Sequence, residues 1–159
     1  MPNVARSRSI PTSATRVWAL IADPHNLPRW WPETVRVEDV HGSPGSRRSR
    51  FTQVFETSKG KPVRADYRCS ASTEDERIVW QQEIEGTPFE GFLREAELEL
   101  RLRCGSEGVE TTEVTVEGRR RLRGLSKLGS PMMRRATGRT LAAALAGIED
   151  ALCGAPGAR

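Results

Sequence analysis

The chain has 159 residues, enough for one domain, expected at residues 1–159 with a core of about 3–152, that buries roughly 68–70% of its unfolded surface. Counted with glycine, its apolar fraction lies just under the usual globular range of about 45–50%, which predicts a modest and even hollow core. Arginine supplies 22 of the 25 cationic side chains behind the net charge of +4; this balance indicates a solvated basic surface, and we expect no nucleic-acid partner.

The cysteine spacing and the hydropathy of the sequence exclude several further classes of protein. Cys69, Cys104 and Cys153 show no C-x-x-C spacing, and with two isolated histidines they form no zinc pattern. The odd cysteine count favours a reducing compartment. No stretch resembles a signal peptide or reaches the roughly 18 apolar residues of a membrane helix. We therefore expect a cytoplasmic protein without metal, cofactor or integral membrane association, as a monomer or homodimer.

The first predicted elements are a strand and a helix. Residues 3–10 alternate in polarity and are followed by a proline, which indicates a strand. Residues 12–23 offer Thr12 or Ser13 as N-cap and carry one apolar stripe at helical spacing. The stripe consists of Ala14, Val17, Trp18 and Ile21.

Residues 23–34, DPHNLPRWWPET, form a proline-rich corner after this helix. The Asp-Pro step predicts a cap with proline at the first position of a second short helix, which the later prolines end. Trp30 and Trp31, the two largest apolar side chains of the segment, thus fall where no long helix can form.

A period of two from residue 34 onward predicts six further strands. They are expected within residues 35–40, 47–57, 63–71, 77–85, 92–104 and 109–118. Short turns between them indicate an antiparallel meander with one apolar face that needs a cover. Residues 125–152 predict the covering helix, because apolar residues recur there at helical spacing. These residues are Leu125, Leu128, Met132, Ala136, Leu141, Leu145, Ile148 and Leu152.

The order of these elements and the stretch IPTSATRVWALIADPHNLPRWWPET resemble the START-like, Bet v 1-like (SRPBCC) superfamily, in particular its bacterial polyketide cyclase/dehydrase and lipid-transport group. The resemblance covers about residues 3–152. It implies an α+β helix-grip fold: a seven-stranded antiparallel curved sheet wrapped around a long C-terminal helix, with two short helices between strands one and two. It also implies a ligand-sized cavity with Trp30 and Trp31 at one end.

Polar residues on the otherwise apolar strand faces are the candidate ligand contacts. Gln53, Tyr67, Gln82 and Arg94 each lie between apolar neighbours, and a buried polar group without a partner costs about 1–3 kcal/mol. We expect these side chains to hydrogen-bond either to a ligand or to one another, and Arg94 could instead extend to solvent. The predicted cavity residues are Trp30, Trp31, Phe51, Gln53, Phe55, Tyr67, Trp80, Gln82, Phe92, Arg94, Met132 and Ala136.

Other charged groups have simpler interpretations. Glu95, Glu97 and Glu99 share one strand face, where we expect them to point to water opposite arginines of neighbouring strands. His25 and His41 are expected at the surface, although His25 would be the available general base if it faced the cavity mouth. A basic cluster could contact an acidic partner. It comprises Arg119, Arg120, Arg121, Arg123, Lys127, Arg134 and Arg135.

Three hypotheses follow. The first is binding or carriage of a small hydrophobic or aromatic metabolite, lipid-like or polyketide-like, in an internal cavity. The second is a polyketide aromatase/cyclase-like enzyme that assists enolisation through Tyr67 or Arg94. The third is an interaction protein, for example a toxin-like stress protein, that uses its basic face.

Overall fold

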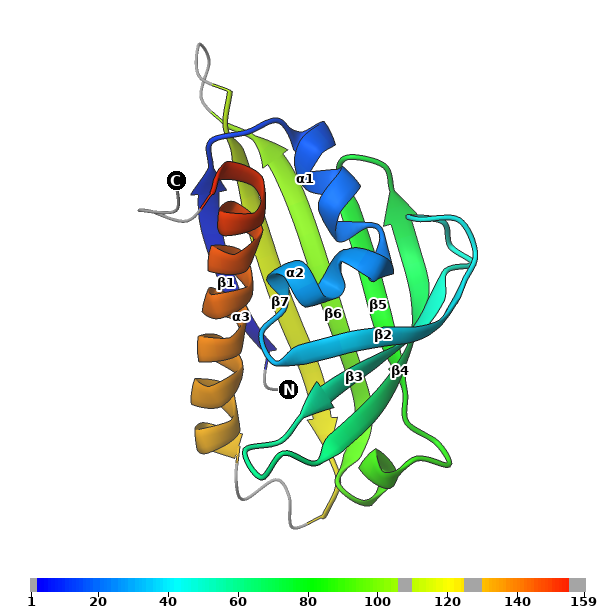
Figure 1. The fold of residues 1–159 in the computed structure, drawn as a ribbon. Coiled ribbons are helices and arrows are strands. Elements are labelled where there is room, and N and C mark those ends of the chain that lie inside the picture. The colour runs from blue at the N-terminus through cyan, green and yellow to red at the C-terminus, as the bar shows by residue number, and fades with distance from the viewer. Residues whose placement is uncertain (1–2, 106–109, 125–129, 155–159) are drawn as a thin grey trace.

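The computed structural model describes residues 3–105, 110–124 and 130–154. Seven strands form one antiparallel sheet in the order β1-β7-β6-β5-β4-β3-β2, and α1, α2 and α3 lie on one side of it (Figure 1). The strands are β1 (Asn3–Ile10), β2 (Thr34–His41), β3 (Arg50–Glu56), β4 (Pro62–Thr73), β5 (Arg77–Glu83), β6 (Leu93–Cys104) and β7 (Thr112–Leu122). The helices are α1 (Ala14–Ile21), η1 (Pro24–Asn26), α2 (Leu27–Trp30), η2 (Pro88–Gly91) and α3 (Ser130–Cys153). The predicted helix-grip fold is confirmed.

Local capping explains the turn from β1 into the helical segment. The Ser13 side chain accepts a hydrogen bond from the Arg16 backbone N–H, which resolves the choice between the two predicted N-caps. At the next cap, Asp23 accepts from the His25 backbone N–H, with proline at the first position of η1. Trp31 then has extended backbone angles, so α2 ends after a single turn.

Helix α2 is held against α3 by a close backbone approach. A Cβ atom built on Gly147 would lie 2.9 Å from the carbonyl carbon of Trp30 and closer still to its oxygen, so only glycine allows the two helices to meet here. The core on this side is dense, because Leu141, Leu145 and Ile148 of α3 are each at most 2% exposed. The C-terminal half of α3 therefore provides the apolar cover that the sequence predicts.

The N-terminal half of α3 behaves differently. Met132 is 79% exposed and Ala136 is exposed, although both belong to the predicted apolar stripe. Leu125 and Leu128, the first two members of that stripe, lie outside the described residues. The helical period is thus correct, but it does not bury this half of the helix in a packed core.

Register irregularities interrupt three of the strand pairs: β2 with β3, β4 with β5, and β6 with β7. The pairing of β6 with β7 is irregular between Leu93 and Glu95, and that of β4 with β5 between Cys69 and Ala71. A bulge adds one residue to one strand and reverses the faces of the residues beyond it. Leu93 consequently takes the buried position that simple alternation assigns to its neighbours, and it is 3% exposed.

Candidate functional site: a cavity between α3 and the sheet

A cavity of about 400 Å³ lies between the N-terminal half of α3 and strands β4 to β7, and we call it the α3 cavity. A second cavity of about 30 Å³ lies beneath α2, and we call it the α2 cavity. Trp31, Tyr67 and Leu98 line both, so the two spaces adjoin one another. The volume of the α3 cavity falls within the range of about 300–1,000 Å³ that is usual for small-molecule sites.

An aromatic cluster forms the wall between the two cavities. The Phe51 ring stacks on Tyr67 with centroids 5.3 Å apart, and its other neighbour, Trp80, meets it edge-on at 4.9 Å. Trp30 and Trp31 are in T-shaped contact at 5.6 Å. Such pairs contribute about 0.5–1.5 kcal/mol beyond their burial, so the cluster is a rigid wall. Trp30 is buried and Trp31 is half-buried.

The two inward-facing glutamines differ in their partners. The Gln53 amide donates a hydrogen bond of 2.8 Å to the hydroxyl of Thr34, so the internal-network interpretation holds for this residue. The Gln82 amide nitrogen is buried and has no hydrogen-bond partner among the described residues. Gln82 lines the α3 cavity, whereas Gln53 lines only the α2 cavity. Gln82 thus differs from Gln53 in lining the α3 cavity and in having a buried amide nitrogen without a partner among the described residues.

Tyr67 and Arg120 are further polar residues of the α3 cavity lining. Burial raises the pKa of the Tyr67 phenol, and the positive charge of Arg120 opposes part of that rise. The phenol is therefore neutral and able to donate a hydrogen bond at physiological pH. Arg120 pairs with Ala96 across β6 and β7, which places it on the cavity side of the sheet.

Nine of the twelve predicted cavity residues line one or both cavities. These are Trp30, Trp31, Phe51, Gln53, Tyr67, Trp80, Gln82, Met132 and Ala136. Phe55, Phe92 and Arg94 do not. Arg94 is the extra residue at the β6 bulge and is exposed, and Phe92 precedes that bulge and is 39% exposed. Phe55 lies beyond Gln53 on β3, half-buried and outside both linings.

The prediction that Arg94 points into the cavity is therefore wrong, and Arg120 is the arginine found there. Sequence reasoning grouped Arg120 with a basic surface cluster. The alternation of Thr112, Val114 and Val116, continued past Gly118, would have placed Arg120 on the inner face.

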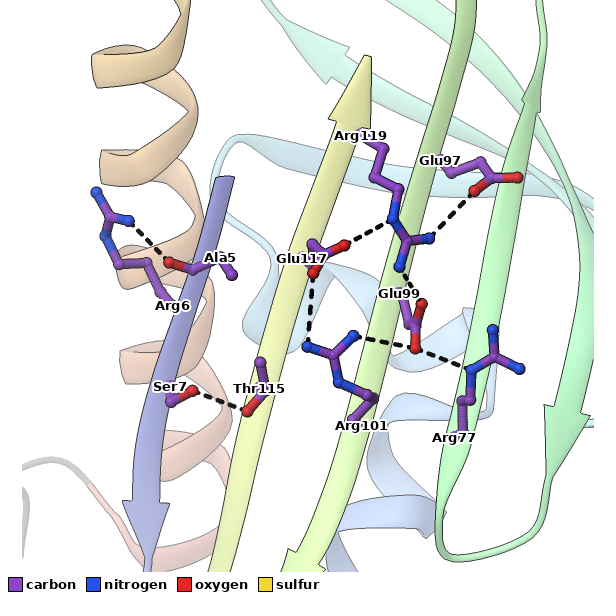
Figure 2. Close-up of polar contacts among 10 residues, drawn as sticks. All are labelled: Ala5, Arg6, Ser7, Arg77, Glu97, Glu99, Arg101, Thr115, Glu117 and Arg119. Atoms are coloured by element: carbon purple, nitrogen blue, oxygen red, sulfur yellow. Dashed lines mark hydrogen bonds and ion pairs between the residues drawn. The ribbon is translucent and has the colours of Figure 1, made fainter. Parts of the chain in front are cut away.

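The outer face of the sheet carries an ion-pair network that includes Arg119 of the predicted basic cluster (Figure 2). Glu99 accepts from Arg77 at 2.8 Å, Arg101 at 3.1 Å and Arg119 at 2.5 Å. Arg119 also contacts Glu117 at 2.6 Å and Glu97 at 3.2 Å. The expected pairing of these glutamates with arginines of neighbouring strands is confirmed. However, the Glu99 side chain is only 4% exposed, because the arginines cover it.

Burial opposes ionisation of Glu99, but the hydrogen bonds from Arg77, Arg119 and Arg101 outweigh it and lower its pKa from 4.5 to about 2. Arg121 pairs with Glu95 at 3.6 Å on the same face, and Arg123 donates to the Leu93 carbonyl. The members of the basic cluster on β7 are therefore divided between its two faces, and Arg134 and Arg135 lie exposed on α3. Lys127 lies outside the described residues.

The predicted alternative for His25 finds no support in its position. His25 is exposed and contacts Asp23 at 3.0 Å, away from the linings of both cavities. His41 is also exposed and lines a separate surface depression of about 360 Å³. Within the described residues, no group of three or more His, Cys, Asp or Glu side chains is placed to hold a metal ion. None of the helices described is long and apolar enough to cross a membrane.

A curved antiparallel sheet that encloses a cavity with its long terminal helix defines the helix-grip class of proteins. Residues 1–152 match the family described as polyketide cyclase / dehydrase and lipid transport, and the chain belongs to this family. No curated protein matches the chain.

Solved structures show the same fold at low sequence identity. The protein TTHA0849 from Thermus thermophilus is similar over 95% of this chain and 97% of its own, at 21% identity and a TM-score of 0.73. A START superfamily protein from Mycobacterium smegmatis is similar over 94% and 96%, at 16% identity and a TM-score of 0.74. The di-domain ARO/CYC BexL of the BE-7585A biosynthetic pathway is 22% identical with a TM-score of 0.71; the match covers 94% of this chain and 45% of BexL.

Proposed function

We propose that this protein binds, as a carrier or receptor, a small hydrophobic or aromatic metabolite in the α3 cavity. The observation that carries the proposal is the cavity itself, about 400 Å³ in volume and lined mainly by apolar groups of the sheet and α3. Its lining includes Met132, which is 79% exposed, so the first turns of α3 would form the entrance. Apolar pockets with a few convergent polar groups are the usual small-molecule sites.

The aromatic wall sets the expected shape of the ligand. Trp31 and Tyr67 face both cavities, so a ring held against them would be in contact with the cluster that Phe51 and Trp80 support. Rigid aromatic side chains lose little rotamer freedom when a ligand binds, which favours flat or ring-bearing molecules. The family description includes both lipid transport and polyketide chemistry, which agrees with a ligand of this kind.

The proposal is tested by titrating the protein with Nile red, a neutral apolar dye, and then displacing the dye with candidate lipids and polyketides. Ala136→Trp places an indole in the cavity lining from an exposed helical position, and we expect it to abolish dye binding. Ala143→Trp is the matched control, since Ala143 is exposed on the same helix and outside both linings. Equal dye binding by both variants, or no binding by the unaltered protein, would contradict the proposal.

A second candidate, an aromatase/cyclase-like enzyme, is favoured by the presence of Tyr67 and Arg120 on the same cavity. A neutral phenol and a guanidinium beside a ligand carbonyl could stabilise the oxyanion that forms on enolisation. This version replaces Arg94 with Arg120 in the predicted pair. It predicts that Tyr67→Phe removes turnover of a poly-β-ketone substrate while dye affinity and melting temperature stay nearly unchanged.

A further inference from the structure

One row of side chains crosses the floor of the α3 cavity from β4 to β7. Tyr67 pairs directly with Gln82, and Ala96 pairs directly with Arg120. Gln81 pairs with Glu97, so Gln82 lies beside Ala96 in the adjacent strand. The row is therefore Tyr67, Gln82, Ala96 and Arg120, and all four residues line the cavity.

The small side chain of Ala96 leaves space between the polar members of this row. Adjacent strands are about 4.8 Å apart, so the row is about 14 Å long from β4 to β7. The long side chains of Tyr67 and Arg120 start at its two ends, and Gln82 lies between them. A polar group of a ligand above Ala96 would thus be within reach of all three.

The polar groups of the row are hydrogen-bond donors. The Tyr67 phenol is neutral and can donate a hydrogen bond. The Gln82 amide nitrogen is buried without a partner among the described residues. Rotation about the χ3 torsion of Gln82 can turn this nitrogen toward the cavity. Arg120 carries a permanent positive charge and five N–H donors. The row therefore suits a ligand group that accepts hydrogen bonds and carries negative charge.

Nothing described in the chain neutralises Arg120. The nearest acidic residue of the lining, Glu97, directs its carboxylate to Arg119 at 3.2 Å on the opposite face (Figure 2). Arg120 forms no ion pair with the described residues, in contrast to its neighbours Arg119 and Arg121. The segment 123–129 that joins β7 to α3 contains no Asp or Glu in its sequence.

We propose that the α3 cavity binds an organic anion, with the carboxylate of an otherwise apolar molecule held by Arg120, Gln82 and Tyr67 above Ala96. This inference rests on the proposed function and specifies its ligand class. A planar carboxylate matches the fork of one guanidinium. One guanidinium balances the single charge of a carboxylate, whereas a doubly charged phosphate would keep one charge uncompensated.

The test compares matched acid and neutral probes by isothermal titration calorimetry at pH 8 on the full chain. The pairs are 2-naphthoate with 2-naphthamide and decanoate with 1-decanol, so an aromatic and an aliphatic carboxylate are distinguished. We expect the acid of at least one pair to bind about tenfold or more tightly than its neutral partner, a difference of about 1.4 kcal/mol. Arg120→Gln should remove this preference, because it should weaken binding of the acid far more than binding of its neutral partner.

Two controls separate the cavity from general surface charge. Arg121→Gln removes the adjacent charge on the outer face and should keep the preference, and Arg120→Lys should keep part of it. Equal binding of acid and neutral probes, or equal effects of Arg120→Gln and Arg121→Gln, would overturn the carboxylate site and leave the proposed function standing. If none of the four probes binds and Nile red does not bind either, both proposals fail.

Discussion

The two buried glutamines of the inner face allow a sharp test of which polar group is left for a ligand. Replacing Gln82 with methionine removes an amide whose nitrogen is buried without a partner among the described residues, at similar side-chain volume. An unsatisfied buried donor costs about 1–3 kcal/mol, so Gln82→Met should stabilise the ligand-free protein by about 1 kcal/mol or more. The corresponding rise in melting temperature is about 2–4 °C for each kcal/mol in a chain of this size.

Gln53→Met is the matched control and should have the opposite sign. Its amide donates to the Thr34 hydroxyl at 2.8 Å, so the substitution removes a made hydrogen bond and leaves that hydroxyl unpaired. We expect a loss of about 1 kcal/mol. Both variants are compared with the unaltered chain by urea and thermal unfolding, after refolding from denaturant to remove any carried ligand.

Opposite signs would show that the Gln82 amide is unpaired in the ligand-free protein and so available to a ligand. A loss of stability in Gln82→Met as large as that in Gln53→Met would refute the reasoning, since the Gln82 amide would then be paired in solution. The same Gln82→Met variant should bind 2-naphthoate more weakly than the unaltered protein. A gain in stability together with a loss of affinity is the expected signature of a side chain retained for binding.

Two further predictions concern the scaffold. Glu99→Gln should lower the free energy of unfolding at pH 7 by about 3 kcal/mol, because the pKa of Glu99 falls from 4.5 to about 2 on folding. This stabilisation is present above pH 4.5 and is lost as the pH falls toward 2, so the stability of the Glu99→Gln variant should not show this loss between pH 4.5 and 2. The control Glu95→Gln removes a carboxylate from a largely exposed ion pair and should cost less than about 1 kcal/mol. Gly147→Leu should cost about 1–3 kcal/mol in urea unfolding, because its Cβ would meet the Trp30 carbonyl group, with the carbonyl carbon only 2.9 Å away. Ala143→Leu, at an exposed position of the same helix, should change stability by less than about 0.5 kcal/mol.

Alternation identified Phe51, Tyr67 and Gln82 as inner-face residues because the pairing of β3, β4 and β5 is regular at these three positions. Phe51 pairs directly with Tyr67, and Tyr67 with Gln82, so residues chosen by polarity alone come together in one wall. The same rule failed on β6, where one extra residue at the bulge turns Arg94 outward. A bulge depends on pairing with the neighbouring strand, which a single strand sequence does not encode.

The high charge of the segment around Arg120 concealed the position of this residue in the cavity lining. The run of three arginines at 119–121 has the composition of a solvated surface, yet strand alternation sends Arg119 and Arg121 to the outer face and Arg120 to the inner face. Composition describes a segment as a whole, whereas successive side chains of a strand point to two faces with different surroundings. Periodicity was therefore the better guide than charge density in this strand.

The cavity arises from small residues that face one another across the helix–sheet interface. Ala96 and Gly118 on the sheet oppose Ala136 and Thr137 on α3, and a Cβ built on Gly118 would reach only ordinary van der Waals distance, 3.4 Å, from the Thr137 methyl group. Larger apolar residues at these positions would close the space and extend the packing that Leu141 and Ile148 make further along α3. Helix α3 thus seals the core with its C-terminal half and lines the α3 cavity with its N-terminal half, and the polar row lies beneath that N-terminal half.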